Sequence, residues 1–485
     1  MLDATDGQIV TTLPSRRHIV GGWSPRVPVP GSTVIMLKPL GRLLAMLRRQ
    51  RPCARAVLRR GWILWVLGLY KQRATSILRQ RQGRGTRLLM LWMGRHDRHP
   101  IILRELQSLR GSLSVAIVDV NCPSRSSDIA VHRSVRRVGL GFFQTTAWKI
   151  LRLLFRGRLA ELYWTALAVA EELLTAIILG YNALRSRADI FHAHDVWSLV
   201  GAHLAGALSG TPVIYDCHEL ASEQHAAYPL RRRALQLLEH MLLPRSDLVI
   251  VPNRSRAEVY DGQFDLGNRL LIIENCPTPA SYKNTKKIHQ TLGLPDESKV
   301  VLYHGAFMEG RCLDILIKSS RYFLSDVKLV LIGERNEYFH NVLDPLIKAS
   351  NNYVFTLPYI ENQRIMDYVA SADLGIVIYQ NTNLNNYLCA PTKLYDFIMA
   401  CVPVAACDFP GVREVFDRYP VGLTFEPESP QSIADAVNGF FSLDAERLAQ
   451  IHRALDDGRR VLNWDDAAKP LATRLQALAA SGKRR

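Results

Sequence analysis

Two basic residues in the second half of the chain follow patterns that bind phosphate. Arg311 comes just after a glycine-containing loop, residues 305–310, and Lys393 lies at the start of a predicted helix. Cations and helix N-termini both attract phosphate oxygens. A nucleotide diphosphate gains negative charge as the bond to its sugar breaks, and fixed positive charge stabilises that transition state. Arg311 and Lys393 are therefore candidate catalytic residues that could neutralise a departing diphosphate, although Arg311 taken alone fits a solvated surface residue better.

Three further residues of this region are predicted to bind the nucleotide or its sugar. Gly305 belongs to the glycine-containing loop, and Asp396, three residues after Lys393, carries a carboxylate that can accept hydrogen bonds from ribose hydroxyls. Glu414 follows a predicted strand at residues 402–406 and offers a polar contact near the sugar. Simpler interpretations stay open, because the loop can be an ordinary turn and Asp396 can pair with Lys393 on one helix.

Polar residues of the first half also follow predicted strands. His194 and Asp195 come after one strand, and His218 and Glu219 come after the next. The carboxyl ends of parallel strands are where α/β proteins bind their ligands. We expect Asp195, His218 and Glu219 to orient an acceptor or His194, and His192 to be structural. Taken alone, His194 fits a hydrogen-bonded loop histidine as well as a catalytic group.

Strand and helix patterns that could position these residues alternate through most of the chain. The predicted strands form two series, one between residues 88 and 273 and one between residues 300 and 425, joined by a polar linker at 277–290. Such alternation implies parallel sheets covered on both faces. The predicted fold class is α/β, with two facing Rossmann-like domains. The expected parts are a basic helical N-terminal extension (1–85), an acceptor domain (86–280) and a donor domain with a C-terminal helix (281–485).

Seven short motifs occur in a fixed order along residues 87–470. They are Asp189-Ile-Phe-His-Ala-His-Asp195, Tyr215-Asp-Cys-His-Glu219, Ile272-Ile-Glu-Asn275, His304-Gly-Ala-Phe-Met-Glu-Gly-Arg311, Leu331-Ile-Gly-Glu334, Ala372-Asp-Leu-Gly375 and Ala390-Pro-Thr-Lys-Leu-Tyr-Asp-Phe-Ile-Met-Ala400. Together they resemble the family-four retaining glycosyltransferases of the GT-B fold (glycosyl transferases group 1). The resemblance implies that the residues matching Arg311 and Lys393 contact the donor diphosphate. It also implies that His194 faces the donor sugar across a cleft, and that the anomeric configuration is retained.

The sequence departs from this family at one motif. The family normally has two glutamates separated by seven residues, and the matching positions here are Leu388 and Asp396. This difference leaves the contacts to the donor sugar open. No Asp-x-Asp sequence stands at a predicted strand end, which favours a reaction without metal, and no cofactor is expected beyond the nucleotide-sugar substrate.

The positive charge of the chain is concentrated near its N-terminus. Residues 1–85 contain 16 of the 61 Lys and Arg but only two acids, Asp3 and Asp6, whereas the whole chain has a formal charge of +17. A nucleic-acid partner is therefore not expected. Arginines and tryptophans such as Trp62 and Trp65 fit peripheral contact with an anionic membrane, although an arm folded on the catalytic domain, or a mis-assigned start codon, also fits. Eight scattered cysteines favour a reduced, cytoplasmic location. With the basic extension, this predicts a cytoplasmic protein with peripheral contact at the inner face of the cell membrane.

Residues 131–186 are predicted to be a long helical region. Its later part, residues 163–178, resembles a membrane span until Glu171 and Glu172 interrupt it. Carboxylates are costly inside a bilayer, so a buried amphipathic helix is the better interpretation.

The predicted function is transfer of a sugar, of the hexosyltransferase type, from a nucleotide sugar to a glycan or lipid-linked acceptor in polysaccharide or glycolipid biosynthesis. The alternatives are a sugar-nucleotide epimerase of the same fold and a non-catalytic sugar-nucleotide-binding protein. An epimerase needs no acceptor. A binding protein would keep its function when His194 is replaced, whereas an enzyme would lose turnover.

Overall fold

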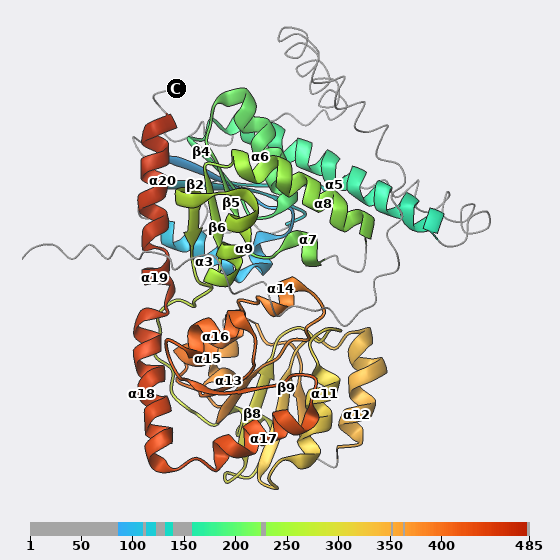
Figure 1. Ribbon diagram of the computed structural model, residues 1–485, viewed down its shortest axis with the longest axis vertical. Helices are drawn as coiled ribbons and strands as arrows, with labels where there is room; N and C mark the ends of the chain where they lie inside the picture. Colours follow the sequence, from blue (N-terminus) through green and yellow to red (C-terminus); the bar gives the residue numbers. More distant parts are fainter. Residues whose placement is uncertain are drawn as a thin grey trace, which may run out of the picture. The chain divides into compact units, whose positions relative to one another are not determined.

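The computed structural model describes residues 86–109, 113–122, 131–138, 158–224, 229–350, 353–361 and 364–482 (Figure 1). The extension predicted at residues 1–85 lies outside them. The described residues form two parallel sheets, one of seven strands and one of six. This arrangement confirms the predicted α/β fold class with two Rossmann-like strand series.

The first sheet has the strand order β3-β2-β1-β4-β5-β6-β7. Its strands are β1 (Arg87–Leu91), β2 (Ser114–Val120), β3 (Val131–Val135), β4 (Ile190–Ala193), β5 (Val213–Asp216), β6 (Leu248–Val251) and β7 (Leu270–Ile272). Six of them lie where the sequence predicts strands. The exception is β3, because the sequence predicts helix from Val131 onward. This segment pairs only with β2, at the edge of the sheet, and a short edge strand carries little of the apolar alternation that identifies a buried one.

Helices cover both faces of the first sheet. They are α3 (Pro100–Leu109), α5 (Arg158–Ser186), α6 (Val196–Ser209), α7 (Ala221–Gln224), α8 (Pro229–Leu242) and α9 (Arg254–Phe264), with short 3-10 turns η1 (His96–Arg98), η2 (Leu243–Arg245) and η3 (Gly267–Arg269). Alternate residues of β1 point to opposite faces. Leu89 and Leu91 belong to the core cluster that includes residues of α5, α6 and α9, whereas Leu88 and Met90 belong to the one with α3.

Helix α5 packs closely against α6. A Cβ atom added at Gly180 would lie 2.6 Å from the carbonyl oxygen of Gly201, so the two backbones touch at a pair of glycines. Glu172 of α5 is buried and forms an ion pair of 2.7 Å with Arg231 of α8. By length and composition, residues 162–186 are the one stretch among the described helices that could cross a membrane. The glycine contact and the buried ion pair show that part of α5 packs against the protein. Only 22% of its most apolar window is buried, so the predicted buried amphipathic helix stays a prediction.

The second sheet has the order β10-β9-β8-β11-β12-β13. Its strands are β8 (Lys299–His304), β9 (Val327–Ile332), β10 (Val354–Leu357), β11 (Leu374–Val377), β12 (Val404–Cys407) and β13 (Gly422–Phe425). The strands are almost entirely apolar, as expected for a parallel sheet covered on both faces. All six overlap predicted strands.

The helices that follow these strands carry most of the predicted donor residues. They are α10 (Lys287–Leu292), α11 (Leu313–Ser319), α12 (Asp344–Lys348), α13 (Ile365–Val369), α14 (Leu384–Tyr387), α15 (Thr392–Met399), α16 (Pro410–Phe416), α17 (Pro430–Phe441), α18 (Ala445–Val461), α19 (Trp464–Ala467) and α20 (Lys469–Gly482), with a 3-10 turn η4 (Ser320–Tyr322) and a π-helical segment η5 (Phe339–Leu343). The predicted donor domain runs to residue 485, but Trp464, Leu471 and Leu475 pack in the core of the first sheet. The domain boundary at residue 280 stays a prediction.

Both sheets reverse their strand order at a defined point. The first reverses between β1 and β4, and the second between β8 and β11. Ligands of open α/β sheets bind at the carboxyl ends of the strands beside such a reversal. These ends lead directly into His194 after β4, Gly305 after β8 and Tyr379 after β11.

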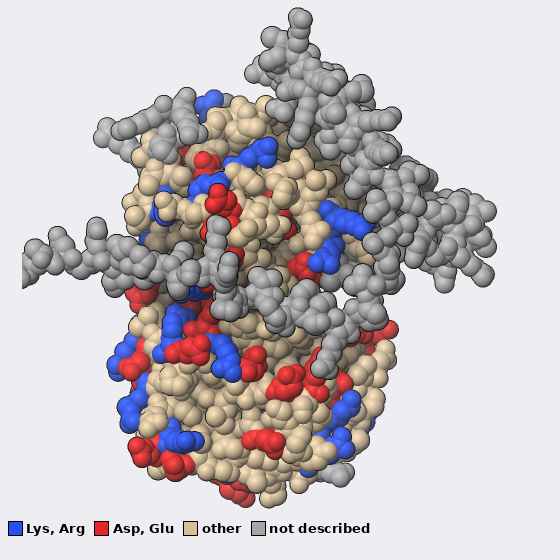
Figure 2. Space-filling model, in the orientation of Figure 1, with Lys and Arg blue, Asp and Glu red and all other residues tan. Residues whose placement is uncertain are grey.

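Basic and acidic side chains are mixed over the described surface seen in Figure 2. No extensive field of one sign covers the described residues on that face. This distribution agrees with the sequence, in which the excess of positive charge lies in residues 1–85.

Candidate active site

The structure brings Arg311 and Lys393 together. The guanidinium carbon of Arg311 lies 4.0 Å from the ring centre of Tyr379, and the Lys393 Nζ atom lies 5.7 Å from the same centre. Lys393 Nζ also lies 4.1 Å from the ring centre of Tyr303. Aromatic faces attract cations, so the two tyrosines hold both charges in place. Neither tyrosine was identified from the sequence, although each adjoins a predicted strand.

These two cations have no carboxylate partner within 4.0 Å among the residues that the structure describes. The Arg311 Nη1 atom is buried without a hydrogen-bond partner, and Lys393 is 8% exposed. Burial, and then the charge of Arg311, lower the pKa of Lys393 to about 7. Two neighbouring cations, of which Lys393 is buried and Arg311 half-buried, are costly when no described carboxylate pairs with them within 4.0 Å, and a bound anion would offset that cost.

Gly305 makes room for the Lys393 ammonium. Its φ angle is +132°, which side-chain-bearing residues rarely adopt, and an added Cβ atom would lie 3.0 Å from Lys393 Nζ. The backbone after β8 can therefore approach the lysine only because the residue is glycine. The glycine-containing loop is therefore more than an ordinary turn, because it leaves space for the Lys393 ammonium.

A cavity of about 660 Å³ opens beside these residues. Its wall includes Gly305, Lys393 and Asp396 from the second sheet region, and Arg104 of α3 from the first. Burial raises the pKa of Asp396 to about 6, although the charges of Arg104 and Lys393 oppose this shift. The volume suits a nucleotide-sized ligand. The ribose contact predicted for Asp396 stays a prediction, and the structure places its carboxylate in the cavity wall.

Two other residues of the cavity wall lacked a predicted role. His304 Nε2 lies 3.9 Å from an Asp396 carboxylate oxygen, and burial together with the charge of Lys393 lowers the pKa of His304 to about 3. Arg104 donates hydrogen bonds to the backbone carbonyls of Asn275 and Cys276, which hold its guanidinium at the cavity. His304 begins one of the family motifs, whereas no pattern distinguishes Arg104 from other helical arginines.

His194 lies apart from the large cavity, in a buried polar cluster at the end of β4. Its Nδ1 atom lies 3.2 Å from His218 Nε2 and 3.5 Å from an Asp216 carboxylate oxygen. Burial, and then the charge of His192, lower the pKa of His194 well below its usual value, so the imidazole is neutral near pH 7. Its Nε2 atom has no hydrogen-bond partner. His218 thus lies where it can orient His194, one of its two expected roles, and that role stays a prediction. Among the described residues, the second ring nitrogen of His194 has no hydrogen-bond partner.

A carboxylate from α3 completes this cluster. Glu105 is buried, and its Oε1 atom lies 3.0 Å from His192 Nδ1. A second cavity of about 10 Å³, enough for a single water molecule, is lined by Glu105, Asp216 and His218 among others. His192 therefore has the structural setting that the sequence predicts, whereas the contribution of Glu105 from a distant helix was not predicted.

Asp195 is fully engaged with the backbone. One carboxylate oxygen accepts a hydrogen bond from the Ser198 amide at 2.7 Å and caps α6, and the other accepts one from the Met93 amide at 2.9 Å. An N-cap of this kind stabilises a helix by about 1 kcal/mol. The carboxylate thus orients the loop that follows β1, and no contact with the large cavity is present.

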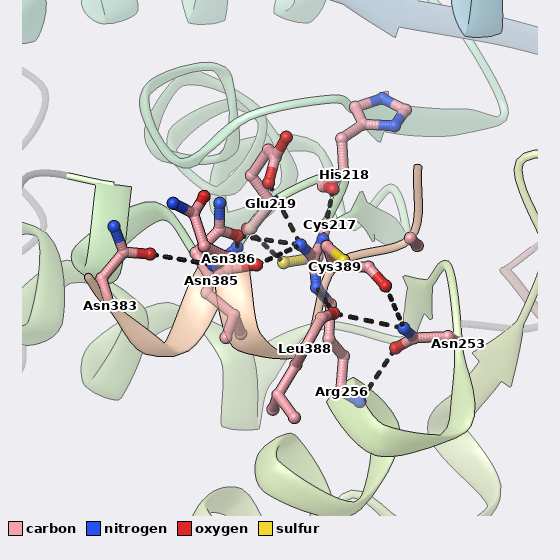
Figure 3. A network of polar contacts seen from close by, with 12 residues as sticks. Cys217, His218, Glu219, Asn253, Arg256, Asn383, Asn385, Asn386, Leu388 and Cys389 are labelled. Atoms are coloured by element: carbon pink, nitrogen blue, oxygen red, sulfur yellow. Dashed lines mark hydrogen bonds and ion pairs between the residues drawn. The ribbon is translucent and has the colours of Figure 1, made fainter. Parts of the chain in front are cut away.

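Glu219 is linked to the second sheet region through Arg256, which is 2% exposed (Figure 3). Arg256 donates hydrogen bonds to the His218 carbonyl at 2.6 Å and to the Glu219 carboxylate at 3.2 Å. The same guanidinium donates to the carbonyls of Asn385 at 3.2 Å and Leu388 at 3.0 Å. Arg256 therefore joins the loop after β5 to the segment that precedes Lys393. Glu219 is also close enough to act electrostatically on Arg311.

Leu388, at the position of the first family glutamate, points away from the donor cavity. Its side chain is 6% exposed and belongs to the core cluster of the first sheet. Its carbonyl accepts a hydrogen bond from the Asn253 side chain at 3.2 Å (Figure 3). The departure from the family motif therefore replaces a polar side chain with an apolar contact between the two halves of the chain.

Glu414 lies outside the cavity wall as well. Its carboxylate accepts hydrogen bonds from the backbone amides of Arg254 at 2.9 Å and Ser255 at 2.6 Å, and from the Ser255 hydroxyl. These amides begin α9, so Glu414 caps a helix of the first sheet from α16 of the second. The structure does not bring Glu414 to the residues with which the sequence grouped it.

Comparison with known proteins agrees with this geometry. The family described as Glycosyltransferase Family 4 matches residues 103–276, and the family described as Glycosyl transferases group 1 matches residues 284–456. A D-inositol 3-phosphate glycosyltransferase of Xylanimonas cellulosilytica is 24% identical over 334 residues, which cover 64% of this chain and 77% of the relative. An uncharacterized glycosyltransferase of Methanocaldococcus jannaschii is 22% identical over 320 residues, covering 63% and 78%.

Solved structures show the same fold. HepE of Anabaena, in complex with UDP and glucose, superposes with a TM-score of 0.60 at 16% identity, covering 81% of this chain and 100% of that structure. Sucrose-phosphate synthase of Thermosynechococcus elongatus superposes with a TM-score of 0.63 at 14% identity, covering 82% and 100%. With both sheets, the paired cations and the two matching family regions in place, the chain belongs to the glycosyl transferases group 1, family-four glycosyltransferases of the GT-B fold that use nucleotide-sugar donors.

Proposed function

We propose that this glycosyltransferase moves a hexose from a nucleoside-diphosphate sugar to a glycan or lipid-linked acceptor. The observation that carries the proposal is a pair of cations, half-buried Arg311 and buried Lys393, which lie 4.0 and 5.7 Å from the ring centre of Tyr379. Neither has a carboxylate partner within 4.0 Å among the described residues. A diphosphate diester carries two negative charges and matches this pair. Both cations would interact more strongly with the leaving diphosphate than with the intact donor, because the diphosphate gains charge as it departs.

A UDP-hexose is the first donor to test. The related structures of HepE contain UDP with glucose, and UDP-glucose. The cavity of about 660 Å³ beside Gly305 and Lys393 has room for a nucleotide and a sugar ring. Asp396 in the wall supplies a carboxylate for the hydroxyl groups of the ribose.

The reaction is proposed to retain the anomeric configuration and to need no metal ion. Positive charge at the diphosphate comes from the two side chains, which supply the electrostatic stabilisation that a divalent cation gives elsewhere. His194 is proposed to act on the sugar side. Its neutral imidazole has a buried Nε2 atom without a partner, which suits a hydrogen bond to the reacting group.

The proposed site of action is the cytoplasmic face of a membrane. Residues 1–85, rich in arginine, would bring the acceptor side to anionic lipid. Deleting residues 1–80 should move the protein from the membrane to the soluble fraction of a cell lysate, with the full-length chain as the comparison. An unchanged distribution would contradict the proposed location and leave the chemistry unaffected.

The function is tested in two steps. A panel of nucleotide sugars is first screened for the one that raises the melting temperature of the protein, because a ligand that binds only the native state stabilises it. Isothermal calorimetry and product analysis then compare the wild type with Arg311→Ala and His194→Ala. We expect Arg311→Ala to lose donor binding by at least tenfold. His194→Ala should bind the donor normally and lose turnover.

Two outcomes would overturn the proposal. Formation of an altered nucleotide sugar without any acceptor would identify an epimerase. A binding protein would be identified by two results together: the wild type binds the donor fully but forms no product with any acceptor, and His194→Ala binds the donor equally well. His203→Ala is a suitable matched control, because His203 lies on α6 and hydrogen-bonds Ser246 at 3.1 Å, away from both cavities.

A further inference from the structure

Four side chains that commonly bind metal ions meet at the edge of the first sheet. His96 comes from η1, Asp119 from β2, Cys122 from the turn after β2, and His132 from β3. One potential ligand atom from each residue lies within 4.8 Å of all the others. These four residues belong neither to the His194 cluster nor to the wall of the large cavity.

Asp119 stands at the centre of this group. His96 Nδ1 lies 2.6 Å from one of its carboxylate oxygens, and His132 Nε2 lies 3.1 Å from the other. The side chains of His96 and Asp119 are 0% exposed, and that of His132 is 6% exposed. Cys122 is also buried. The whole group is therefore shielded from solvent, and both imidazoles direct a nitrogen toward its interior.

The donor set is typical of a zinc ion. Two imidazole nitrogens, one thiolate and one carboxylate give four ligands of the kinds that Zn²⁺ prefers, in the number that structural zinc sites use. Zinc bonds of 2.0 to 2.3 Å imply separations of about 3.3 to 3.6 Å between neighbouring ligand atoms in a tetrahedron. The two nitrogen-to-oxygen separations of 2.6 and 3.1 Å would need to widen by less than about 1 Å.

Charge also favours a divalent ion at this position. One carboxylate and one thiolate balance the two positive charges of Zn²⁺, so the buried group would be neutral overall. Binding requires the thiol proton of Cys122 to leave, and each imidazole must carry its proton on the nitrogen that faces away from the ion. Starting from neutral histidines and an ionised Asp119, one proton is released for each zinc ion bound.

We propose that His96, Asp119, Cys122 and His132 form a structural zinc site. The ion joins η1, the end of β2 and the edge strand β3, and it adds to the parallel pairing of β2 with β3 and to the hydrogen bond from Asn121 N to Val135 O at 2.9 Å. The segment between β1 and η1 begins with Trp92, whose ring packs edge-on against that of His218 with 6.5 Å between the ring centres. The site thus stiffens the loop beside the His194 cluster without taking part in the chemistry.

The test uses the full-length chain without an affinity tag, stripped of metal and then titrated with Zn²⁺ and with Co²⁺. Cobalt bound by a thiolate in a tetrahedral site gives a thiolate-to-metal charge-transfer band. We expect one equivalent of tightly bound metal, with this band present. Cys122→Ser should remove the band and weaken Zn²⁺ binding by at least tenfold. Cys401→Ser, a matched change just after the end of α15 in the second half of the chain, should leave both unchanged.

Several results would overturn the proposal. Absence of the charge-transfer band in the wild type is sufficient by itself and needs no variant. Equal Zn²⁺ affinity in the wild type and Cys122→Ser would assign the metal to another place. If Cys122→Ser fails to fold, His132→Gln is measured instead. This variant keeps the thiol, and an unchanged Zn²⁺ affinity would contradict the proposed site. None of these measurements uses a nucleotide sugar, so they stand apart from the proposed reaction.

Discussion

Donor affinity should fall as the pH rises above 7, because Lys393 loses its charge there. Burial and the charge of Arg311 lower the pKa of Lys393 to about 7. A diphosphate beside the ammonium favours the charged form and raises that pKa again. Binding therefore takes up a proton above pH 7. At pH 8 only about one-tenth of the free protein carries charged Lys393, so affinity is about tenfold lower than at low pH, or about 1.4 kcal/mol.

Three other groups near Lys393 titrate outside this range. The pKa of Asp396 is raised to about 6 by burial, that of His304 is lowered to about 3, and that of Tyr303 is raised to about 12. Arg311 stays charged throughout. Between pH 7 and pH 9 the change in affinity thus reports Lys393, provided that the ligand itself does not titrate. The diphosphate of a nucleotide sugar meets this condition because it is a diester, and for a uridine donor the highest pH is kept low enough that the uracil N3–H stays protonated.

The measurement is isothermal calorimetry of a nucleotide sugar at several pH values, in two buffers with different ionisation enthalpies. The difference between buffers gives the number of protons taken up, which should approach one near pH 8.5. Lys393→Arg keeps a charge at every pH and should flatten the dependence. Lys393→Met should bind weakly and without pH dependence. A wild-type affinity that is constant from pH 7 to 9, or a slope that persists in Lys393→Met, would refute the reasoning.

Two substitutions test other parts of the site. Gly305→Ala places a Cβ atom at φ +132° and 3.0 Å from Lys393 Nζ. It should lower the free energy of unfolding by about 1 to 3 kcal/mol, measured by thermal unfolding, and weaken donor binding, measured by calorimetry. The control Gly293→Ala has φ +65° and open space around the added atom, so it should affect stability only. Glu414→Gln should lower the free energy of unfolding by about 1 kcal/mol through the N-terminus of α9, with donor affinity unchanged. A tenfold loss of donor affinity in Glu414→Gln without loss of stability would instead show that Glu414 contacts the donor.

Strand positions could be predicted from the sequence because a parallel sheet buries both faces of its strands. Runs such as residues 248–251 and 329–332 are apolar throughout, and only a covered strand or a buried helix has that composition. Their short length and the polar segments between them favour strands. The edge strand β3 was not predicted because it is not apolar throughout. It carries His132 and Arg133, and among the described strands it pairs with β2 alone.

Residues at strand ends could be predicted as site candidates, but their partners could not. Gly305, Arg311 and Lys393 are recognisable because local sequence defines a glycine-containing loop and a helix start. Glu414 is different, since its hydrogen-bond donors are 159 and 160 positions away in the chain. A carboxylate after a strand looks the same in sequence whether it binds a sugar or caps a distant helix. The proposed zinc site has the same difficulty, because its ligands are spread from residue 96 to residue 132.

Arg256 indicates why donor and acceptor residues should not be treated as independent. Its guanidinium is bonded to the backbone beside Glu219 and also to the backbone at Leu388, five residues before Lys393. A movement of the loop after β5 is therefore transmitted to the start of α15 through a single buried side chain. An alanine at this position removes the Arg256 donor from the carbonyls of His218 and Asn385, and a buried carbonyl left without a donor costs about 1 to 3 kcal/mol. The Leu388 carbonyl keeps its hydrogen bond from Asn253. The loss would appear in the placement of His218 and of Lys393 together, although Arg256 lines neither cavity.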